Sequence, residues 1–372
     1  METELKHMSP EPSETQSALP PDDASTKDDS PLLKSDSTRI QTENIQELEK
    51  KFAAFVRNDV YGTMGCGELP FTEKLLLGLA FVTLVPIRVL LATFILFFYY
   101  MICRICTLFS SPNRDEEEEQ EDFAHMGGWR RAVIVYSGRF LSRAVLFVFG
   151  FYWVKITFSN LEQLSDKSPG QTESKDTPEE SERPGAIISN HVSYIDILYH
   201  MSSFFPSFVA KRSVGKLPLI GLISKCLGCV YVQRESKSSD FKGVAEGTTT
   251  NGDFLLPFKT GAFVAGAPVH PVILRYPYQR FSPAWDSISG MRHVILLLSQ
   301  FINYMEVTRL PIYYPSQAEK DNPKLYATNV RRLMAQEGDM IMSDIGLAEK
   351  RVYHAALNGN NSLPSVLHPK DD

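Results

Sequence analysis

A long apolar segment, residues 75–109, constrains this chain more than any other feature. Its 35 residues carry only two charges, Arg88 and Arg104. Arg88 divides it into uncharged stretches of 13 and 15 residues, each shorter than the roughly 20 residues that a spanning helix needs. A single straight helix of this length would measure about 52 Å, longer than a hydrocarbon core of about 30 Å. Pro86 predicts a break in the helix.

Three structures fit this segment: one span with an interfacial extension, a re-entrant helical hairpin, or the buried core helix of a soluble protein. Residues 94–103 (FILFFYYMIC) are too apolar on every side for the third. A second apolar segment, 133–158, carries a polar stripe of Arg139, Ser142 and Arg143, which suits a helix lying in or dipping into the interface. We therefore expect membrane association and leave the number of spans open.

Composition changes along the chain and predicts five regions. Residues 1–42 are rich in Ser, Pro, Asp, Thr and Glu and should be disordered. Residues 43–158 form a membrane-associated helical region, and 159–183 form a polar linker. An α/β domain occupies 184–345, and 346–372 form a C-terminal tail. The net charge of −6 argues against nucleic acid as a partner.

Beyond residue 184, short apolar runs alternate with helical patterns, which predicts an α/β fold with a sheet flanked by helices. Strands are expected at 186–189, 207–210, 229–233, 269–274 and 306–313. Helices are expected at 194–203, 217–226, 293–304 and 322–337.

His191 and Asp196 form a His-x4-Asp pair where a predicted strand gives way to a helix. In a continuous helix the two side chains would diverge by about 140°. At a turn-to-helix junction, however, Asp196 can fold back and hydrogen-bond the imidazole. That contact would fix the tautomer and stabilise the imidazolium when His191 takes a proton. Taken as residues alone, a capping Asn and His with a surface Asp is an equally good interpretation.

Two further segments could bind a phosphate. Residues 246–251 (EGTTTN) are small and hydroxyl-rich, and Gly247 allows the backbone to approach a ligand closely. Arg234 directly follows a predicted strand and could bind a phosphate through its forked guanidinium. The basic residues before it, from Lys211 to Lys225, are equally well explained as a solvated face.

Two pairs of cysteines, Cys103-x2-Cys106 and Cys226-x2-Cys229, have the internal spacing of zinc ligands. The first pair lies in the apolar segment, and no convincing set of histidines lies nearby in the sequence. We therefore expect no metal site. His200, His270 and His293 are expected to be packed or surface residues rather than catalytic ones.

Four blocks of sequence resemble those of the glycerolipid acyltransferase family. In chain order they are NHVSYID at 190–196, Arg234 after a strand, EGT at 246–248 and PVHP at 268–271. The sequences of these blocks are most similar to those of the plant lysophosphatidylethanolamine acyltransferases that lack EF-hands. The resemblance covers roughly residues 45–360, and no calcium-loop pattern is present.

The resemblance implies an acyltransferase-like α/β sheet and direct transfer of an acyl group from acyl-CoA to the free hydroxyl of a lysophospholipid, with lysophosphatidylethanolamine favoured. It implies that His191 is the general base, that Asp196 orients it and that Pro271 shapes the substrate pocket. The residues implied to hold the phosphate region of the lysolipid are Arg234, Glu246, Gly247 and Thr248. No metal, cofactor or acyl-enzyme is implied.

The location is expected to be the endoplasmic reticulum membrane, with the site facing the cytosol. Three features support this expectation: the apolar segment, five sparse cysteines typical of a reducing compartment, and the lack of a secretory signal pattern.

One departure from the family pattern concerns residues 235–245. In the family a helix and a strand separate the Arg block from the EGT block, and the strand delivers Phe-Pro before Glu-Gly-Thr. Here eleven residues lie between, and Val244-Ala245 stand where Phe-Pro is expected. Eleven residues cannot hold a crossover and a strand, so we expect one strand to be missing, a sheet edge beside His191 and reduced activity. The alternative function is therefore a catalytically impaired membrane protein with an acyltransferase-like shell.

Overall fold

The computed structural model describes residues 47–115, 120–159, 184–232 and 248–358, and residues from 48 onward belong to one unit. Its α-helices are α2 (Phe71–Val82), α3 (Leu84–Cys106), α4 (Gly128–Val148), α5 (Ile195–Ser203), α6 (Ile220–Leu227), α7 (Gly290–Ser299), α8 (Gln317–Asp321), α9 (Pro323–Glu337) and α10 (Leu347–Leu357). Its strands are β1 (Asn113–Asp115), β2 (Gln120–Asp122), β3 (Val154–Phe158), β4 (Ala186–Ser189), β5 (Val209–Lys211), β6 (Val230–Val232), β7 (Phe254–Leu255), β8 (Val269–Arg275), β9 (Met305–Arg309) and β10 (Ile341–Met342). The predicted tail at 1–42, and the linker from residue 160 on, lie outside the described residues.

A four-stranded mixed sheet carries the site. Its strand order is β3-β9-β8-β4, in which β4 is parallel to β8, β8 is antiparallel to β9, and β9 is parallel to β3. The central strand β8 is an almost continuous apolar run, and five of its seven residues are buried. Such a run is typical of a strand that is covered on both faces.

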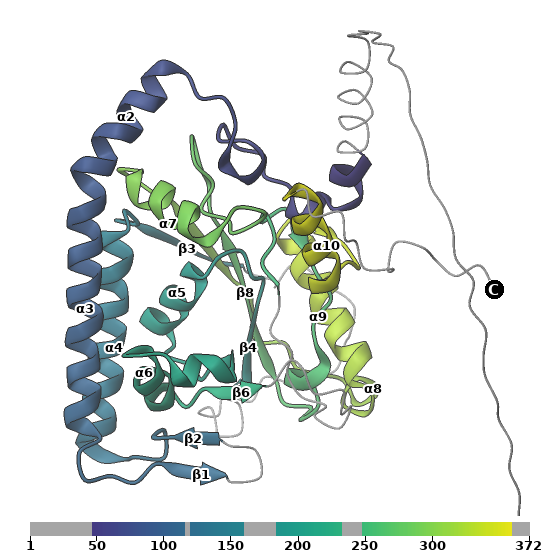
Figure 1. Cartoon of the computed structure of the whole chain (residues 1–372). Coiled ribbons are helices and arrows are strands. Elements are labelled where there is room, and N and C mark those ends of the chain that lie inside the picture. Colours follow the sequence, from purple (N-terminus) through teal and green to yellow (C-terminus); the bar gives the residue numbers. More distant parts are fainter. Residues whose placement is uncertain (1–46, 116–119, 160–183, 233–247, 359–372) are drawn as a thin grey trace, which may run out of the picture. The chain divides into compact units, whose positions relative to one another are not determined.

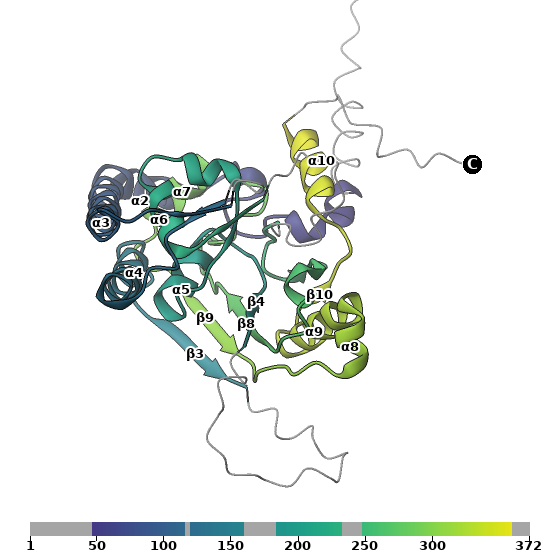
Figure 2. The same ribbon diagram turned by 90° about the horizontal axis from the view of Figure 1, so that it is seen from below.

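Helices cover both faces of this sheet, so the predicted α/β class is confirmed. In Figure 2, α4 and α5 lie on one side and α9 on the other. Helix α5 contacts α4, α4 contacts α3, and α9 contacts β8. One apolar core lies between the sheet and α5, and another lies between the sheet and α9.

The apolar segment folds into two helices, α2 and α3, which break at Thr83 rather than at Pro86 (Figure 1). Pro86 is the third residue of α3. A proline is tolerated there because the first amides of a helix have no partner inside it. By length and composition, α3 is the one helix of the described chain that could cross a membrane.

Arg88 explains how a charge is accommodated in this apolar helix. It is 3% exposed, so it does not face a lipid environment. Its guanidinium donates to the carbonyl oxygens of Leu298 (2.9 Å), Gln300 (2.5 Å) and Phe301 (2.9 Å), and to the hydroxyl of Tyr152 (3.2 Å). Arg88 thus fastens α3 to the chain that follows α7.

The predicted boundary of the helical region at residue 158 is wrong. Residues 154–158 form β3, which pairs with β9 from Val154↔Met305 to Phe158↔Arg309. The apolar pattern of residues 133–158 hid the change from helix to strand, because short apolar runs fit either structure. The region that the sequence predicts to be membrane-associated therefore contributes an edge strand to the α/β sheet.

The predicted C-terminal tail also begins too early, because residues 347–357 form helix α10. Val352 and Tyr353 of α10 share a small buried cluster with Phe52 and Phe55 from the N-terminal end of the described unit. Residues near the two ends of the described unit thus meet, a contact that no local pattern can show.

Strand β4 forms an edge of the main sheet. Within the described residues it pairs with β8 alone, while β5 and β6 pair with each other in a separate parallel sheet. The expected missing strand and sheet edge beside His191 stay a prediction. The shortened segment 235–245 itself lies outside the described residues.

Candidate active site

The histidine loop, residues 190–196, joins the end of β4 to the start of α5. Asp196 is the second residue of α5 and folds back over the turn, as predicted for a turn-to-helix junction. Its Oδ2 lies 2.8 Å from His191 Nδ1. The same oxygen accepts the backbone N–H groups of Val192 (2.8 Å) and Ser193 (3.0 Å). These two backbone N–H groups thus order Asp196, and Asp196 in turn orders the imidazole.

The second oxygen of the Asp196 carboxylate is also bonded. Its Oδ1 accepts the hydroxyl of Tyr276 at 2.5 Å. Burial, with the Asp196 charge as a second cause, raises the pKa of Tyr276 well above its usual value, so the phenol keeps its proton and remains a donor. Both oxygens of the Asp196 carboxylate are therefore held by hydrogen bonds from groups other than the His191 imidazole.

The loop is anchored to the sheet by Asn190. Its amide Nδ2 donates to the carbonyl of Leu274 and its Oδ1 accepts the N–H of Leu274, both at 2.8 Å. This pair of bonds extends the β4–β8 pairing by one residue beyond the last strand partner, Ser189↔Val272. His191 therefore leaves the sheet from a fixed point.

The two partners differ in exposure. The Asp196 side chain is 4% exposed, whereas that of His191 is 32% exposed. Because a carboxylate only accepts, Nδ1 of His191 carries the proton of their hydrogen bond. Nε2 is then the ring nitrogen that is free to accept a proton from a substrate hydroxyl. This geometry has the form of a base with its orienting carboxylate.

A second loop, residues 248–251, lies against the first, and we call it the threonine loop. The N–H of Thr250 donates to the carbonyl oxygen of His191 at 3.1 Å. Asn251 binds the N-terminal segment, donating from Nδ2 to the carbonyls of Ala53 (2.9 Å) and Val56 (3.0 Å). The structure therefore places the end of the predicted phosphate-binding segment beside His191.

The other predicted substrate residues are placed unequally. Thr248 is half-buried at the start of the threonine loop. Arg234, Glu246 and Gly247 lie outside the described residues, so their roles stay predictions. Pro271 lies in the middle of β8 opposite Ile188, and its carbonyl accepts the N–H of Leu310 at 3.1 Å. This is a position in the sheet, and its role in a pocket also stays a prediction.

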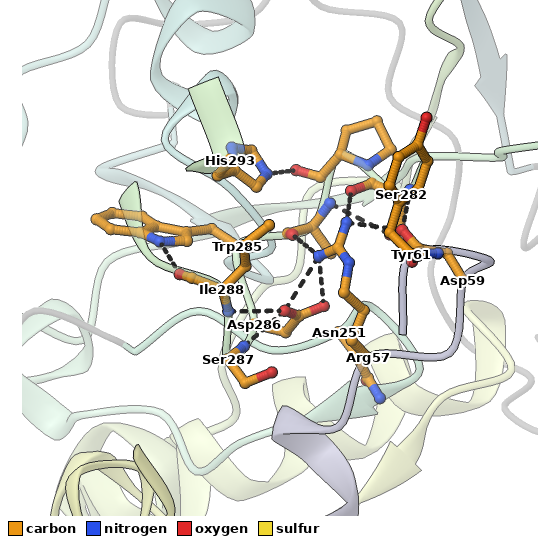
Figure 3. Close-up of polar contacts among 12 residues, drawn as sticks. Arg57, Asp59, Tyr61, Asn251, Ser282, Trp285, Asp286, Ser287, Ile288 and His293 are labelled. Carbon is orange, nitrogen blue, oxygen red and sulfur yellow. Dashed lines mark hydrogen bonds and ion pairs between the residues drawn. The ribbon is translucent and has the colours of Figure 1, made fainter. Parts of the chain in front are cut away.

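A buried polar network behind the two loops was not foreseen from the sequence (Figure 3). The Arg57 guanidinium donates to both Asp286 oxygens (2.9 and 3.1 Å), and it pairs with Asp59 (2.8 Å). Burial raises the pKa of Asp286, and the Arg57 charge opposes this shift. Arg57 and Asp286 are 229 residues apart in sequence, so no spacing signal could have shown this pair.

His293 supports the network as a neutral side chain, and the expectation that it is packed is confirmed. It is fully buried, and burial lowers its pKa to about 3. Its Nε2 donates to the carbonyl of Pro283 at 3.0 Å, so Nδ1 accepts from the hydroxyl of Tyr194 at 3.2 Å. His200 is likewise buried, with a pKa lowered to about 4, and His270 packs on the ring of Phe204.

The four cysteines of the two Cys-x2-Cys pairs gather in one apolar cluster between α3 and α6, and all are free thiols. In the part of the chain that the structure describes, no group of three or more His, Cys, Asp or Glu could hold a metal ion.

Comparison with known proteins decides the family. The sequence profile of the Acyltransferase family matches residues 155–275, which include both loops. The chain is 57% identical to lysophospholipid acyltransferase LPEAT1 of Arabidopsis thaliana, over 100% of both chains. The chain belongs to the lysophospholipid acyltransferases.

More distant relatives of this acyltransferase are longer proteins. It is 29% identical to lysophospholipid acyltransferase LPEAT2 of Arabidopsis thaliana, over 64% of this chain and 46% of the relative. It is 31% identical to lysophosphatidylcholine acyltransferase 1 of Danio rerio, over 72% of this chain and 51% of the relative. The solved 1-acyl-sn-glycerophosphate acyltransferase of Thermotoga maritima covers 73% of this chain with 99% of its own, at 16% identity and a TM-score of 0.40, a score too low to carry an argument.

These relatives favour an active acyltransferase over the alternative of an impaired shell. The alignment with LPEAT1 nevertheless extends over 409 positions, more than the 372 residues of this acyltransferase, so the chain lacks residues that the relative has. Whether they are missing at 235–245, and whether their loss lowers activity, stays a prediction.

Proposed function

We propose that this lysophospholipid acyltransferase uses acyl-CoA as donor and lysophosphatidylethanolamine as the favoured acceptor. One observation carries the proposal: His191 Nδ1 lies 2.8 Å from an Asp196 carboxylate that is itself fixed by two backbone amides and Tyr276. The names of the relatives support a lysophospholipid as the acceptor. The name of LPEAT1 does not specify the head group of that lysophospholipid.

The reaction needs a base for the lysolipid hydroxyl and a thioester carbonyl carbon for that hydroxyl to attack, but it needs no covalent enzyme intermediate. His191 Nε2 takes the proton of the lysolipid hydroxyl as the hydroxyl oxygen attacks the thioester carbonyl carbon. The new C–O ester bond forms, the C–S bond breaks, and the proton passes from the imidazolium to the leaving thiolate, giving phospholipid and free coenzyme A. Asp196 holds the tautomer and stabilises the imidazolium between these steps.

Both substrates are amphiphiles, and the surface beside the site suits a lipid interface. Phe94 (65% exposed) and Phe98 (48%) lie on α3, Phe140 (73%) lies on α4, and Trp153 (72%) follows α4. A soluble monomer rarely exposes so many large apolar side chains on neighbouring helices. We infer that α3 and α4 lie in a membrane. We expect it to be that of the endoplasmic reticulum, with His191 facing the cytosol.

The packing of α3 favours a helix that lies in the plane of the membrane. Its buried residues run from Val85 to Cys106, so protein contacts it along its whole length. A spanning α3 would draw α6 into the hydrocarbon core, together with Lys225 and its ion pair to Glu121. Ion pairs are costly there, whereas an in-plane α3 leaves this one in water.

Acyl transfer is tested with the purified chain, acyl-CoA and a panel of lysophospholipids, with the product measured by mass spectrometry. We expect transfer to lysophosphatidylethanolamine at the highest rate and its loss in His191→Ala. The control is His125→Ala, another histidine with a nearby aspartate, on the surface. Equal rates in the wild type and His191→Ala would overturn the assignment of the base.

Membrane seating is tested in microsomes. Alkaline carbonate should leave the protein in the pellet, and recovery in the soluble fraction would contradict the proposal. For orientation, Lys74→Cys and Ser111→Cys place thiols near the two ends of the α2–α3 pair, in a background where the exposed Cys66 is changed to Ser. An impermeant maleimide should label both in sealed microsomes. Labelling of one only after permeabilisation would show that α3 spans.

A further inference from the structure

Helix α10 reaches the site through one buried cation. Lys350 is 8% exposed. Its ammonium donates to the carbonyl oxygen of Thr249 (2.8 Å), to the hydroxyl of Thr249 (2.7 Å) and to the carbonyl oxygen of Trp285 (3.0 Å). An ammonium has three N–H donors, so all three are used. Among the described residues Lys350 makes no ion pair, and neutral dipoles hold the charge.

The two residues that Lys350 joins belong to segments that each bond the histidine loop. The threonine loop donates from Thr250 N–H to the carbonyl of His191 at 3.1 Å. Trp285 donates from its backbone N–H to the carbonyl of Val192 at 2.9 Å. The hydroxyl of Thr249 also donates to the carbonyl of Trp285 at 2.6 Å, which closes the contact between the two segments.

A side chain whose role was only to fill space at residue 350 would not be expected to be that of a lysine. Removing an ammonium from water costs free energy unless its hydrogen bonds are replaced, and burial lowers the pKa of Lys350 to about 8. The cost is met by three bonds that converge on Thr249 and Trp285. A neutral apolar side chain of similar length would avoid the cost but would leave the Thr249 carbonyl without this donor.

We propose that Lys350 is a positioning residue of the acyl-transfer site. It does not touch the substrate. It fixes the threonine loop, which directly follows Glu246 and Gly247 in the sequence, against the histidine loop. It thereby sets where the acceptor lies relative to His191. This inference rests on the proposed function and extends the functional unit to α10, beyond the residues matched by the family profile.

The kinetic test compares Lys350→Met with Arg351→Met, which removes a cation from the exposed neighbouring position of α10. Because a displacement of about 1 Å can cost about 100-fold in rate, we expect kcat/KM of Lys350→Met to fall about 10–100-fold. The change should fall mainly on KM for the lysophospholipid, with KM for acyl-CoA kept. Lys350→Arg, which retains a buried donor cation, should recover part of the loss, while Arg351→Met should match the wild type.

A second readout does not depend on activity. Hydrogen–deuterium exchange should speed up in peptides that contain the Thr250 and Trp285 amides in Lys350→Met, while the amides of β8 keep their protection. Unchanged exchange there, or faster exchange throughout the protein, would overturn the proposal. If the wild type transferred no acyl group, the proposed function would fail, and the exchange data alone would still decide whether Lys350 holds the two loops.

Discussion

The histidine loop and the threonine loop lie side by side, yet they are held in place by different means. In the histidine loop, Asp196 bonds groups three to five residues away, and Asn190 clips the loop to the adjacent strand. The threonine loop depends on remote chain: Asn251 bonds a segment nearly 200 residues earlier, and Thr249 accepts from Lys350, 101 residues later.

This difference separates the two tasks of the site. The histidine loop orders a base. Asp196 and its bonds to residues 191–193 lie within a short stretch of sequence, and Leu274 and Tyr276 add bonds from the neighbouring strand region. The threonine loop sets the distance from the base to the acceptor, and its order comes from the completed fold. We therefore expect damage to the first to appear in kcat and damage to the second to appear in KM for the acceptor.

The largest effect should come from His191→Ala, which removes the base itself. The expected loss in kcat is about 10²–10⁴-fold, the usual contribution of general base catalysis. Folding should be unaffected, because the imidazole is partly exposed. The assay is single-substrate turnover with acyl-CoA saturating, and a KM effect without a kcat effect would contradict the division of tasks.

A smaller effect on the same loop is expected from Tyr276→Phe. It removes the hydrogen bond to Asp196 Oδ1 but keeps the ring in its buried site. A hydrogen bond to a charged group contributes about 1.5–3 kcal/mol, so kcat should fall about 10-fold. KM for the lysophospholipid should stay within a factor of two if the loops act separately. A matched change in both constants would show that Tyr276 also places the acceptor.

On the other loop, Asn251→Ala should raise KM for the acceptor about 5-fold and leave kcat nearly unchanged. The two carbonyls of the N-terminal segment would lose a donor, at a cost of about 1–3 kcal/mol each if they stay dry. Thermal unfolding measured beside the kinetics gives the stability part. The control is Asn358→Ala, an exposed asparagine with one local bond. A fall in kcat alone would break the comparison.

The smallest effect is a pH dependence of the threonine loop. The folded pKa of Lys350 is about 8, lowered by burial, and the titratable groups that face it are Asp286 and His354, of which burial lowers the pKa of His354 and leaves it neutral in this range. The unfolded chain keeps a pKa near 10.5 and binds more protons between these values, so this group makes folding more favourable as pH rises through that window. KM for the acceptor should rise above pH 8 in the wild type, without loss of thermal stability. A flat KM from pH 7 to 9 would contradict it, and Lys350→Arg, which stays charged, should show the flat profile.

Much of the fold could be predicted because its elements carry local patterns. Strand β4 and the helix at 195–203 fall where the apolar runs predicted them, and so does the contact between His191 and Asp196. That contact needs only a turn followed by a helix start, which the six residues 191–196 specify.

The errors have a common cause, which is that burial is decided by the whole fold. Residues 154–158 are apolar enough to form either a helix or a strand. They form a strand because they pair with β9. Residues 300–304 were predicted as the end of a helix, yet α7 ends at Ser299 because the Gln300, Phe301 and Leu298 carbonyls turn toward Arg88. Neither the bonds of Lys350 nor the pair of Arg57 with Asp286 carries a spacing signal, since these partners are distant in the sequence.

Arg88 also sets a constraint on how this protein is made. Its carbonyl partners begin 210 residues later in the chain, at Leu298. A ribosome that adds about 5–20 residues per second reaches them roughly 10–40 s after Arg88 is synthesised. Until then the guanidinium lacks its three carbonyl partners and can bind only the Tyr152 hydroxyl, made 64 residues later, water or lipid phosphates. In the membrane seating proposed above, this charge would hold the newly made α3 at the membrane surface until the C-terminal half has been synthesised.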